Sequence, residues 1–253
     1  MNKIILITGA TSGIGKACAE KFAANGYDLI ITGRREERLN KLKKEIENNN
    51  NVRVLPLCFD IRDKDAMIAA MDSLDDYWKK IDVLVNNAGL ALGLNPIHEG
   101  SFEDWETMID TNIKGLLYMS KLVANLMIKN KKGHIIHIGS IAGREAYPNG
   151  NVYVATKHAV EGLTKSMRID LMPYNIKVTQ IAPGAVETEF SDVRFKGNQE
   201  RAKLVYKGYQ PLRGEDVSEV VYYVTTFPPH VNINDLLIMP FAQANATMFN
   251  KNS

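Results

Sequence analysis

Short apolar runs alternate with longer amphipathic stretches along almost the whole chain, and this alternation restricts the possible folds more than any other feature. Runs rich in Ile, Val and Leu occur at residues 4–8, 28–32, 52–57, 83–86, 134–139, 177–182 and 235–240. Continuously apolar strands are typical of a parallel sheet that is covered on both faces. Stretches such as 16–25 and 36–49 place apolar residues three and four positions apart, which indicates helices. The sequence therefore predicts a doubly wound α/β fold of about seven parallel strands.

Length, charge and cysteine content narrow the class of protein. We interpret the 253 residues as one domain over residues 1–253. The 31 Lys and Arg residues against 29 Asp and Glu give a net charge of +2, which favours neither nucleic acid nor a membrane as partner. Cys18 and Cys58 cannot build a disulfide framework. The first apolar run is too short for a signal peptide, and no stretch approaches the ~18 apolar residues of a membrane span, so we expect a cytoplasmic protein.

A glycine-rich turn, T-G-A-T-S-G-I-G at residues 8–15, joins the first predicted strand to a helix. Glycines at such a turn let backbone N–H groups approach a pyrophosphate, and the helix N-terminus adds positive potential. The spacing differs from the common G-x-G-x-x-G fingerprint, and the alternative is a tight loop that binds nothing. Its place between a strand and a helix favours a Rossmann-like dinucleotide site.

Two arginines follow the second predicted strand, where a site for NAD would be expected to carry an acidic residue. Asp28 opens that strand and so lies at the edge away from the ligand, and we interpret it as a turn residue. Arg34 and Arg35 lie at the carboxyl end, where a guanidinium can pair with a 2′-phosphate. This placement predicts NADP(H) as the cofactor. The alternative is a set of ordinary ion pairs on an exposed helix start, formed by Arg34, Arg35 and Arg38 with Glu36 and Glu37.

Tyr153 and Lys157 are four residues apart in a helical pattern, so their side chains share one face. A free phenol has a pKa near ~10, which is high for acid–base chemistry at neutral pH. A neighbouring ammonium favours the phenolate, so we expect Lys157 to lower the pKa of Tyr153. A Y-x-x-x-K pair alone is common on surfaces and becomes specific only together with other site residues.

Three other polar segments fall where a ligand site is expected. Ser140 follows the strand predicted at 134–139, and N-N-A-G at 86–89 ends another strand. Asn112 lies inside a helical pattern, although an amide is a poor helix former and needs a reason to be there.

The order of TGATSGIG, NNAG, Asn112, Ser140, YVATK and Pro183-Gly184 resembles the classical short-chain dehydrogenase/reductase family over residues 1 to about 190. The resemblance implies a seven-stranded parallel sheet and hydride transfer between nicotinamide and a carbonyl or alcohol carbon. It implies that Tyr153 is the acid–base group and that Ser140 positions the substrate oxygen. Lys157 would lower the pKa of the tyrosine and bind the nicotinamide ribose, and Asn112 would hold a water of the proton relay.

The resemblance also implies a set of cofactor contacts. Asp60 and Ile61 would contact adenine, and Asn87 would contact the adjoining ribose. The full set of expected NADP contacts is Gly9, Thr11, Ser12, Gly13, Ile14, Gly15, Arg34, Arg35, Asp60, Ile61, Asn87, Ala88, Gly89, Tyr153, Lys157, Pro183, Gly184, Val186 and Thr188.

Further segments, among them GRREERL, NNAGLALG and TEFSDVRFKG, are similar to the NADP-dependent 3-hydroxy acid dehydrogenases. Members of that group oxidise L-allo-threonine, serine, 3-hydroxypropionate and related 3-hydroxy acids or reduce malonic semialdehyde, and they are usually homotetrameric. The similarity covers nearly the whole chain and departs mainly at 144–149 and in the last dozen residues. Because the 144–149 stretch follows Ser140, we expect it to line the substrate pocket.

The segment 185–210 is polar and poorly periodic, and so long an irregular connection is often a lid. A 3-hydroxy acid needs a partner for its carboxylate, and a guanidinium is the natural one. Arg194 in the lid and Arg144 near Ser140 are the candidates, with an ordinary surface position as the alternative for each. Residues 242–253 could form a disordered tail or an arm packed on a neighbouring subunit.

No metal site is expected, because His134 and His137, three apart on a strand, face opposite sides of the sheet. The leading hypothesis is an NADP-dependent dehydrogenase of short 3-hydroxy acids. One alternative is a short-chain reductase of another carbonyl, such as a 3-oxoacyl thioester or a diketone. A second is a non-catalytic NADP-binding sensor, against which the intact Ser140, Tyr153 and Lys157 argue.

Overall fold

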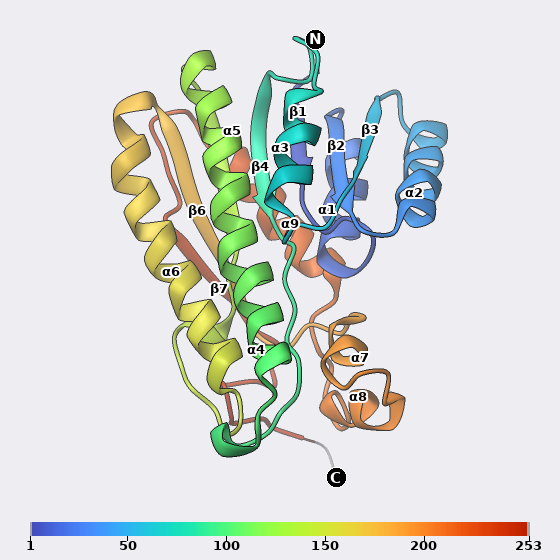
Figure 1. Cartoon of the computed structure of the whole chain (residues 1–253), viewed down its shortest axis with the longest axis vertical. Helices are drawn as coiled ribbons and strands as arrows, with labels where there is room; N and C mark the ends of the chain where they lie inside the picture. Colours follow the sequence, from blue (N-terminus) through green and yellow to red (C-terminus); the bar gives the residue numbers. More distant parts are fainter. Residues whose placement is uncertain (1, 252–253) are drawn as a thin grey trace.

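The computed structural model describes residues 2–251 and contains a seven-stranded parallel sheet in the order β3-β2-β1-β4-β5-β6-β7 (Figure 1). The strands are β1 (Ile4–Ile7), β2 (Asp28–Gly33), β3 (Val54–Cys58), β4 (Ile81–Asn86), β5 (Gly133–Ile138), β6 (Ile176–Pro183) and β7 (Asp235–Ile238). Every strand matches a predicted apolar run, so the doubly wound α/β fold is confirmed. The strand order reverses between β1 and β4, and ligands of such sheets bind at the carboxyl ends of the strands beside that reversal.

Helices cover both faces of the sheet (Figure 1). One layer consists of α1 (Gly13–Ala24), α2 (Glu36–Asn49) and α9 (Gly214–Thr225), and the other of α3 (Lys64–Asp72), α5 (Leu116–Asn130) and α6 (Asn151–Leu171). Ile5 and Ile7 of β1 belong to the buried cluster beneath the first layer, whereas Ile4 and Leu6 belong to the cluster beneath the second. The alternation of side chains along one strand therefore supplies two separate cores, which explains why the strand sequences are continuously apolar.

The remaining elements lie at or near the carboxyl edge of the sheet, except η4 (Met172–Tyr174), which precedes β6 at the amino edge. The others are η1 (Ile97–Glu99), α4 (Phe102–Ile109), the π-helical turn η2 (Asp110–Gly115), η3 (Ile141–Gly143), α7 (Phe190–Arg194) and α8 (Gln199–Val205). The segment predicted as an irregular lid thus contains two short helices, α7 and α8, which lie beyond the ends of the strands in Figure 1.

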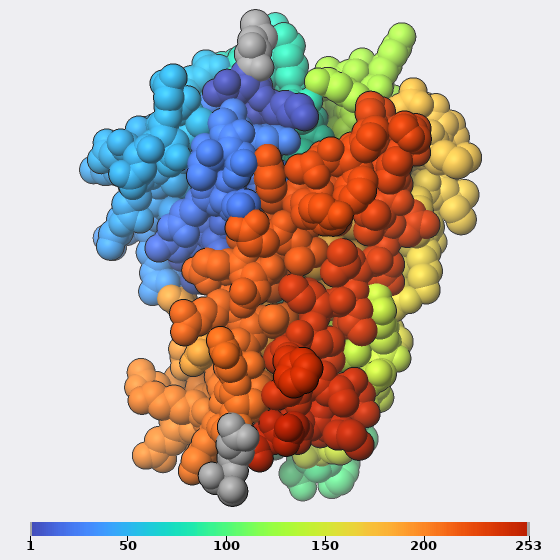
Figure 2. Space-filling model, turned by 180° about the vertical axis from the view of Figure 1, so that it is seen from behind, coloured from blue at the N-terminus to red at the C-terminus, as the bar shows by residue number. Residues whose placement is uncertain are grey.

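The C-terminal residues pack back on their own chain. Gln243 is buried, and its Oε1 accepts a hydrogen bond from the backbone N of Ala185 at 2.8 Å. The backbone N of Ala246 donates to Glu145 Oε2 at 2.8 Å. In Figure 2 the orange and red atoms of the C-terminal part cover much of the face shown. Residues 242–251 thus contact their own chain rather than forming a disordered tail, the arm on a neighbouring subunit stays a prediction, and residues 252–253 lie outside the described residues.

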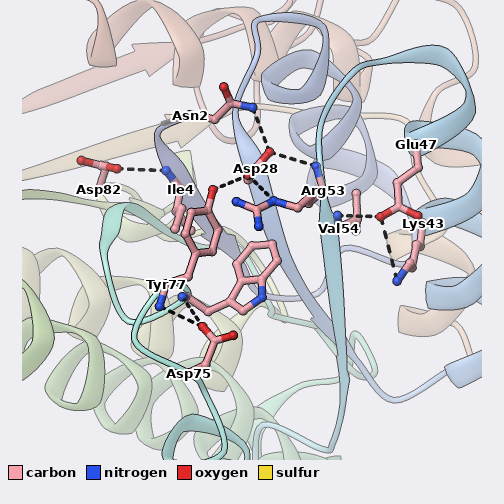
Figure 3. A network of polar contacts seen from close by, with 11 residues as sticks. Asn2, Ile4, Asp28, Lys43, Glu47, Arg53, Val54, Asp75, Tyr77 and Asp82 are labelled. Atoms are coloured by element: carbon pink, nitrogen blue, oxygen red, sulfur yellow. Dashed lines mark hydrogen bonds and ion pairs between the residues drawn. The ribbon is translucent and has the colours of Figure 1, made fainter.

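Asp28 is the centre of a polar network at the amino edge of the sheet (Figure 3). Its carboxylate accepts hydrogen bonds from the backbone N of Arg53 at 2.9 Å, from Arg53 Nε at 3.1 Å and from Asn2 Nδ2 at 3.0 Å. The hydroxyl of Tyr77 donates to the same carboxylate, and the Arg53 guanidinium lies 3.7 Å from the centroid of the Tyr77 ring. Asp28 therefore lies at the edge away from the ligand, as predicted, but it joins β2 to β3 and to the loop before β4 rather than serving only as a turn residue.

We expect Asp28→Asn to lower the free energy of unfolding by about 1.5–3 kcal/mol at neutral pH, because it removes hydrogen bonds to a buried charge. Burial raises the pKa of Asp28, but hydrogen bonds from Tyr77, Arg53 and Asn2 outweigh that effect and lower the pKa below its ordinary value. The stabilisation is therefore complete above the pKa of an unfolded Asp, about 3.9, and is lost as the pH falls through the lower folded value. Urea titrations at pH 7 and pH 3 measure the difference.

The matched control for this prediction is Asp76→Asn, which changes an exposed carboxylate near Tyr77. It is expected to alter the free energy of unfolding by no more than about 0.5 kcal/mol. A deficit of Asp28→Asn that stayed the same at both pH values would mean that the charge of Asp28 does not stabilise the fold.

Candidate active site

The carboxyl ends of the central strands border one cavity of about 480 Å³, and the 185–210 segment forms its other side. A cavity of this size can take a small ligand or part of a dinucleotide. Nearly all positions predicted to contact cofactor or substrate line it. Within the described part of the chain, the exceptions are Gly15, Asn112 and Arg144.

The glycine-rich turn borders the cavity at the start of α1. Gly9 and Gly13 have φ values of +67° and +53°, a region that glycine occupies without strain. A Cβ atom on Gly15 would lie 2.3 Å from the carbonyl oxygen of Gly9, so no larger residue fits there. The turn and the positive end of α1 therefore face the same space, which is the arrangement that binds a pyrophosphate.

Arg34 and Arg35 both border the cavity, as predicted, but their contacts differ. Arg35 Nη2 donates to Thr11 Oγ1 at 2.6 Å and to Ser12 Oγ at 2.9 Å, so this guanidinium lies against the glycine-rich turn. Arg34 has a side chain that is 58% exposed, and its Nη1 lies 3.6 Å from Asp60 Oδ2. Arg34 is therefore the more available of the two cations.

An acidic residue from the opposite side of the cavity pairs with this group of arginines. Glu189 Oε2 accepts from Arg35 Nη1 at 2.9 Å, and Glu189 Oε1 accepts from Arg38 Nη1 at 2.7 Å. Across residues 2–251, none of the three arginines forms an ion pair with Glu36 or Glu37. The alternative of ordinary pairing along the start of the helix is thus wrong, because Arg34 pairs with Asp60 and Arg35 and Arg38 pair with Glu189 instead.

Ser140, Tyr153 and Lys157 border the cavity from two elements and are buried, with exposed fractions of 9%, 9% and 7%. Ser140 follows β5, and its Oγ accepts from the backbone N of Ala142 at 3.1 Å. Tyr153 and Lys157 lie one turn apart on α6, as their spacing predicts. Lys157 Nζ donates to the carbonyl oxygen of Ile138 at 3.0 Å and lies 5.9 Å from the centroid of the Tyr153 ring. A hydroxyl, a phenol and an amine thus border one cavity.

The pKa of Tyr153 departs from the expectation. Burial raises the pKa of this phenol, and Tyr147 adds to the increase, while the Ser140 hydroxyl and the Arg194 guanidinium oppose it without prevailing. Burial also lowers the pKa of Lys157 to about 8. The sequence predicts that Lys157 lowers the pKa of Tyr153. Burial of the phenol outweighs such an effect, and the Lys157 amine donates its hydrogen bond to the carbonyl oxygen of Ile138. At neutral pH Tyr153 is therefore protonated and able to donate a proton.

Asn112 breaks the α-helical pattern, which accounts for its unusual place in the sequence. It lies in the π-helical turn between α4 and α5, and its side chain is buried. Its Oδ1 accepts from the backbone N of Leu90 at 2.9 Å, and its Nδ2 donates to Leu90 O at 2.8 Å and to Thr156 Oγ1 at 3.0 Å. Asn112 thereby joins the segment after N-N-A-G to α6 beside Lys157. The water-holding role implied for it stays a prediction.

Of the two candidate carboxylate partners, the structure places only Arg194 at the cavity. Arg194 Nη2 donates to the hydroxyl of Tyr147 at 3.0 Å, and its guanidinium lies 5.7 Å from the centroid of the Tyr153 ring. Arg144 Nη2 lies 2.5 Å from Asp235 Oδ1. The candidate Arg144 is therefore wrong as a pocket residue, because the carboxylate at the start of β7 holds its side chain elsewhere.

The structure adds residues that the sequence did not single out. Tyr147 is the one member of 144–149 that lines the cavity, so the expectation for that stretch holds only for its aromatic residue. Glu189 and Phe190 line the cavity from the 185–210 segment, and Phe249 lines it from the C-terminal residues. An aromatic residue near Ser140 could have indicated Tyr147, but no periodicity or motif marks Glu189.

The two strand histidines are structural. His134 Nε2 lies 2.7 Å from Thr179 Oγ1, whereas His137 Nδ1 lies 2.8 Å from Thr164 Oγ1 on the other face of the sheet. Burial lowers the pKa of each to about 3, so both are neutral at pH 7. Within residues 2–251, no cluster of His, Cys, Asp and Glu is suited to hold a metal ion, and none of the helices there has the length and apolar character of a membrane span.

Comparison with known proteins identifies the family to which the chain belongs. The model of the short chain dehydrogenase family matches residues 3–199, and the chain belongs to this family. The family recognised from the motifs is thus confirmed.

Particular members are similar over almost their full length. The chain is 50% identical over 244 residues to the NADP-dependent 3-hydroxy acid dehydrogenase YdfG of Salmonella typhi, covering 96% of this chain and 97% of that protein. It is 45% identical over 245 residues to sulfoacetaldehyde reductase 2 of Chromohalobacter salexigens, covering 96% of each. The solved closed form of serine dehydrogenase complexed with NADP⁺ has a TM-score of 0.91 at 47% identity and covers 99% of this chain and all of that one.

Proposed function

We propose that this protein is an NADP-dependent oxidoreductase of short 3-hydroxy acids, of the L-allo-threonine, serine and 3-hydroxypropionate class. The proposal rests on one observation, which is that a single cavity is lined by Ser140, Tyr153, Lys157 and Arg194. A cation beside the acid–base group suits a substrate that has a carboxylate close to its reacting carbon. The similar 3-hydroxy acid dehydrogenase and the similar serine dehydrogenase support the substrate class.

The residues at the cavity fit NADP. The turn at Gly9–Gly15 leaves room only for backbone beside the start of α1, and Arg34 offers an exposed guanidinium at the carboxyl end of β2. Lys157 has its amine at the cavity with one hydrogen-bond acceptor, Ile138 O, so it can also donate to a ribose hydroxyl. NADP would supply or accept the hydride when bound.

The protein's own groups handle the substrate oxygen and its proton. Ser140 can hydrogen-bond a carbonyl oxygen in the cavity, and Tyr153, protonated at neutral pH, can donate a proton to that oxygen during reduction. Oxidation needs the phenol as a base. Because burial raises the pKa of Tyr153, we expect oxidation of the alcohol to speed up with rising pH and reduction to be favoured near neutrality.

A panel of substrates assayed with NADP and with NAD tests the function. Strong NADP-linked oxidation of L-allo-threonine, serine or 3-hydroxypropionate supports the proposal, and its absence overturns it. Sulfoacetaldehyde belongs in the panel as a second candidate, because a guanidinium at Arg194 binds a sulfonate as well as a carboxylate and the similar sulfoacetaldehyde reductase has that substrate in its name. Preference for a 3-oxoacyl thioester or a diketone would favour another reductase.

Arg194→Ala tests the carboxylate partner. We expect kcat/KM for 3-hydroxypropionate to fall by about 10- to 100-fold, because a hydrogen-bonded charge pair contributes about 1.5–3 kcal/mol. An uncharged alcohol such as propan-1-ol is expected to change far less. Arg144→Ala is the matched control, since that guanidinium pairs with Asp235 and does not line the cavity. Equal losses on charged and uncharged substrates would show that Arg194 does not recognise the carboxylate.

We also propose a cytoplasmic homotetramer. Leu237 of the edge strand β7 is 40% exposed and Phe241 after this strand is fully exposed, while Ile169 of α6 and Met172 of η4 are about 70% exposed. Large apolar side chains exposed in this way suit subunit contacts where they lie together on the surface. Sedimentation velocity measures the assembly, and a stable monomer would overturn this part of the proposal.

A further inference from the structure

Glu189 connects two parts of the molecule that are far apart in the sequence. It follows Thr188 and directly precedes α7, in the segment that borders the substrate side of the cavity. Its carboxylate accepts hydrogen bonds from Arg35 at 2.9 Å and from Arg38 at 2.7 and 3.0 Å. Both arginines come from the junction of β2 and α2. The carboxylate therefore holds the start of α7 against the group of cations at which we expect the 2′-phosphate.

The hydrogen bonds of Arg35 leave little capacity for another anion. Its Nε and Nη2 donate to Thr11 and Ser12 of the glycine-rich turn, and its Nη1 donates to Glu189. A guanidinium has five N–H donors, and a phosphate needs two of them on one edge for a bidentate contact. Arg35 can therefore make a bidentate contact with a phosphate only if Glu189 leaves its Nη1. Arg38 is paired with the same carboxylate, because its Nη1 donates to both oxygens of Glu189, while its Nε and Nη2 have no partner among the described residues.

A 2′-phosphate has enough negative charge to displace the Glu189 carboxylate from Arg35 and Arg38. It carries a charge of about −1.5 to −2 at neutral pH and three acceptor oxygens, whereas a carboxylate carries one charge and two oxygens. Burial raises the pKa of Glu189, but its bonds to Arg35 and Arg38 outweigh that and lower the pKa, so the group is ionised at pH 7. Its exposed side-chain fraction of 44% means that solvent reaches it and that displacement does not require a buried charge to be released.

A movement of Glu189 would reach the substrate side of the cavity through a single short helix. Glu189 immediately precedes α7, and Arg194 is the last residue of α7. Arg194 donates to the hydroxyl of Tyr147 and to the carbonyl oxygen of Gly93, at 3.0 and 3.3 Å, within reach of Tyr153. The two ends of the five-residue α7 thus contact the predicted cofactor phosphate site and the predicted substrate carboxylate site.

We propose that Glu189 is an internal anion that occupies Arg35 and Arg38, and that the 2′-phosphate of NADP displaces it and thereby releases α7 to close on the substrate. Glu189 then determines cofactor specificity, because NAD has a hydroxyl at this position and cannot displace a carboxylate from two guanidinium groups. This inference rests on the proposed NADP function and adds the residue that couples the phosphate to the substrate side.

The test uses Glu189→Gln, which keeps the shape of the side chain and removes its charge, with two nucleotides that differ only in the 2′-phosphate. Calorimetry measures the affinity for adenosine 2′,5′-bisphosphate and for adenosine 5′-monophosphate. We expect the variant to bind the bisphosphate about tenfold more tightly than the unmodified protein does and the monophosphate with unchanged affinity. Glu187→Gln is the matched control, because Glu187 is an exposed carboxylate two residues away, and it is expected to change neither affinity.

Hydrogen exchange of the backbone amides in 189–197 gives a second readout. In the unmodified protein the bisphosphate, and not the monophosphate, is expected to change exchange in this segment. Glu189→Gln is expected to show the changed exchange without any nucleotide.

The possible failures are distinguishable. If Glu189→Gln bound the bisphosphate no more tightly than the unmodified protein, or gained equally for both nucleotides, the displacement would be overturned while the NADP proposal stood. If the unmodified protein bound both nucleotides equally, the NADP proposal and this inference would fall together.

Discussion

Replacing Tyr153 by Phe is expected to lower kcat by about 10²- to 10⁴-fold, the usual contribution of a positioned acid–base group. The phenol borders the cavity together with Ser140 and is protonated at neutral pH, whereas the benzene ring of Phe fills the same space without a proton to give. Affinity for NADPH, followed by the change in its fluorescence, is expected to stay within about threefold of the original because the ring volume is kept. Single-turnover measurements separate the chemical step from binding.

Tyr147→Phe is the matched control, because it removes another phenol from the same cavity. The hydroxyl of Tyr147 accepts from Arg194, so its loss is expected to raise KM for charged substrates more than it lowers kcat. If the unmodified protein and Tyr153→Phe showed the same negligible turnover across the whole panel, the alternative of a non-catalytic NADP-binding sensor would replace the enzyme.

The second large effect is expected from Arg34→Asp combined with Arg35→Ala, which should weaken NADP by about 100-fold or more and NAD by far less. Each charge-assisted hydrogen bond to a phosphate contributes about 1.5–3 kcal/mol, and the new carboxylate repels the phosphate. Kd values for both cofactors, measured at one fixed salt concentration, test the difference, since exposed charges are screened by salt.

Lys41→Asp combined with Lys44→Ala is the matched control. It makes the same change in net charge on exposed positions of α2, the helix that follows these arginines. If the control weakened NADP as much, the effect would be one of overall charge. Loss of both cofactors alike in Arg34→Asp with Arg35→Ala would mean that the arginines serve folding, as the contacts of Arg35 with Thr11 and Ser12 of the glycine-rich turn would then explain.

The fold could be predicted closely because the sheet is covered on both faces. The strands are rich in Ile, Val and Leu, so each run stands out from its surroundings and ends where a polar residue or glycine lies at the carboxyl edge. The positions of Ser140, Tyr153 and Lys157 could be predicted as well, because the end of a strand and a helical spacing of four residues are both visible in the local sequence.

The remaining features depend on contacts between distant segments. Glu189 lies more than 150 residues from Arg35, and nothing in the sequence near either residue announces the pair. Arg144 is close to Ser140 in sequence, but its guanidinium forms an ion pair with Asp235 of β7 and so does not line the cavity. The pKa of Tyr153 depends on how completely the phenol is enclosed, and the spacing of Tyr153 and Lys157 contains no information about that enclosure.

The π-helical turn at Asp110–Gly115 has a consequence for how this active site can change over time. Each residue of an α-helix advances the side chains by about 100°, so one residue more or fewer at this turn would rotate all that follows. Met108 before the turn packs near Tyr153, whereas Met119 and Val123 after it pack against the sheet. The π-helical turn therefore sets the rotation between α4 and α5 that allows Met108 to pack near Tyr153 while Met119 and Val123 pack against the sheet. Substitutions along the helix can accumulate one at a time, but a single-residue deletion at the turn would misalign the catalytic side and the core together, so this segment should tolerate changes of residue far better than changes of length.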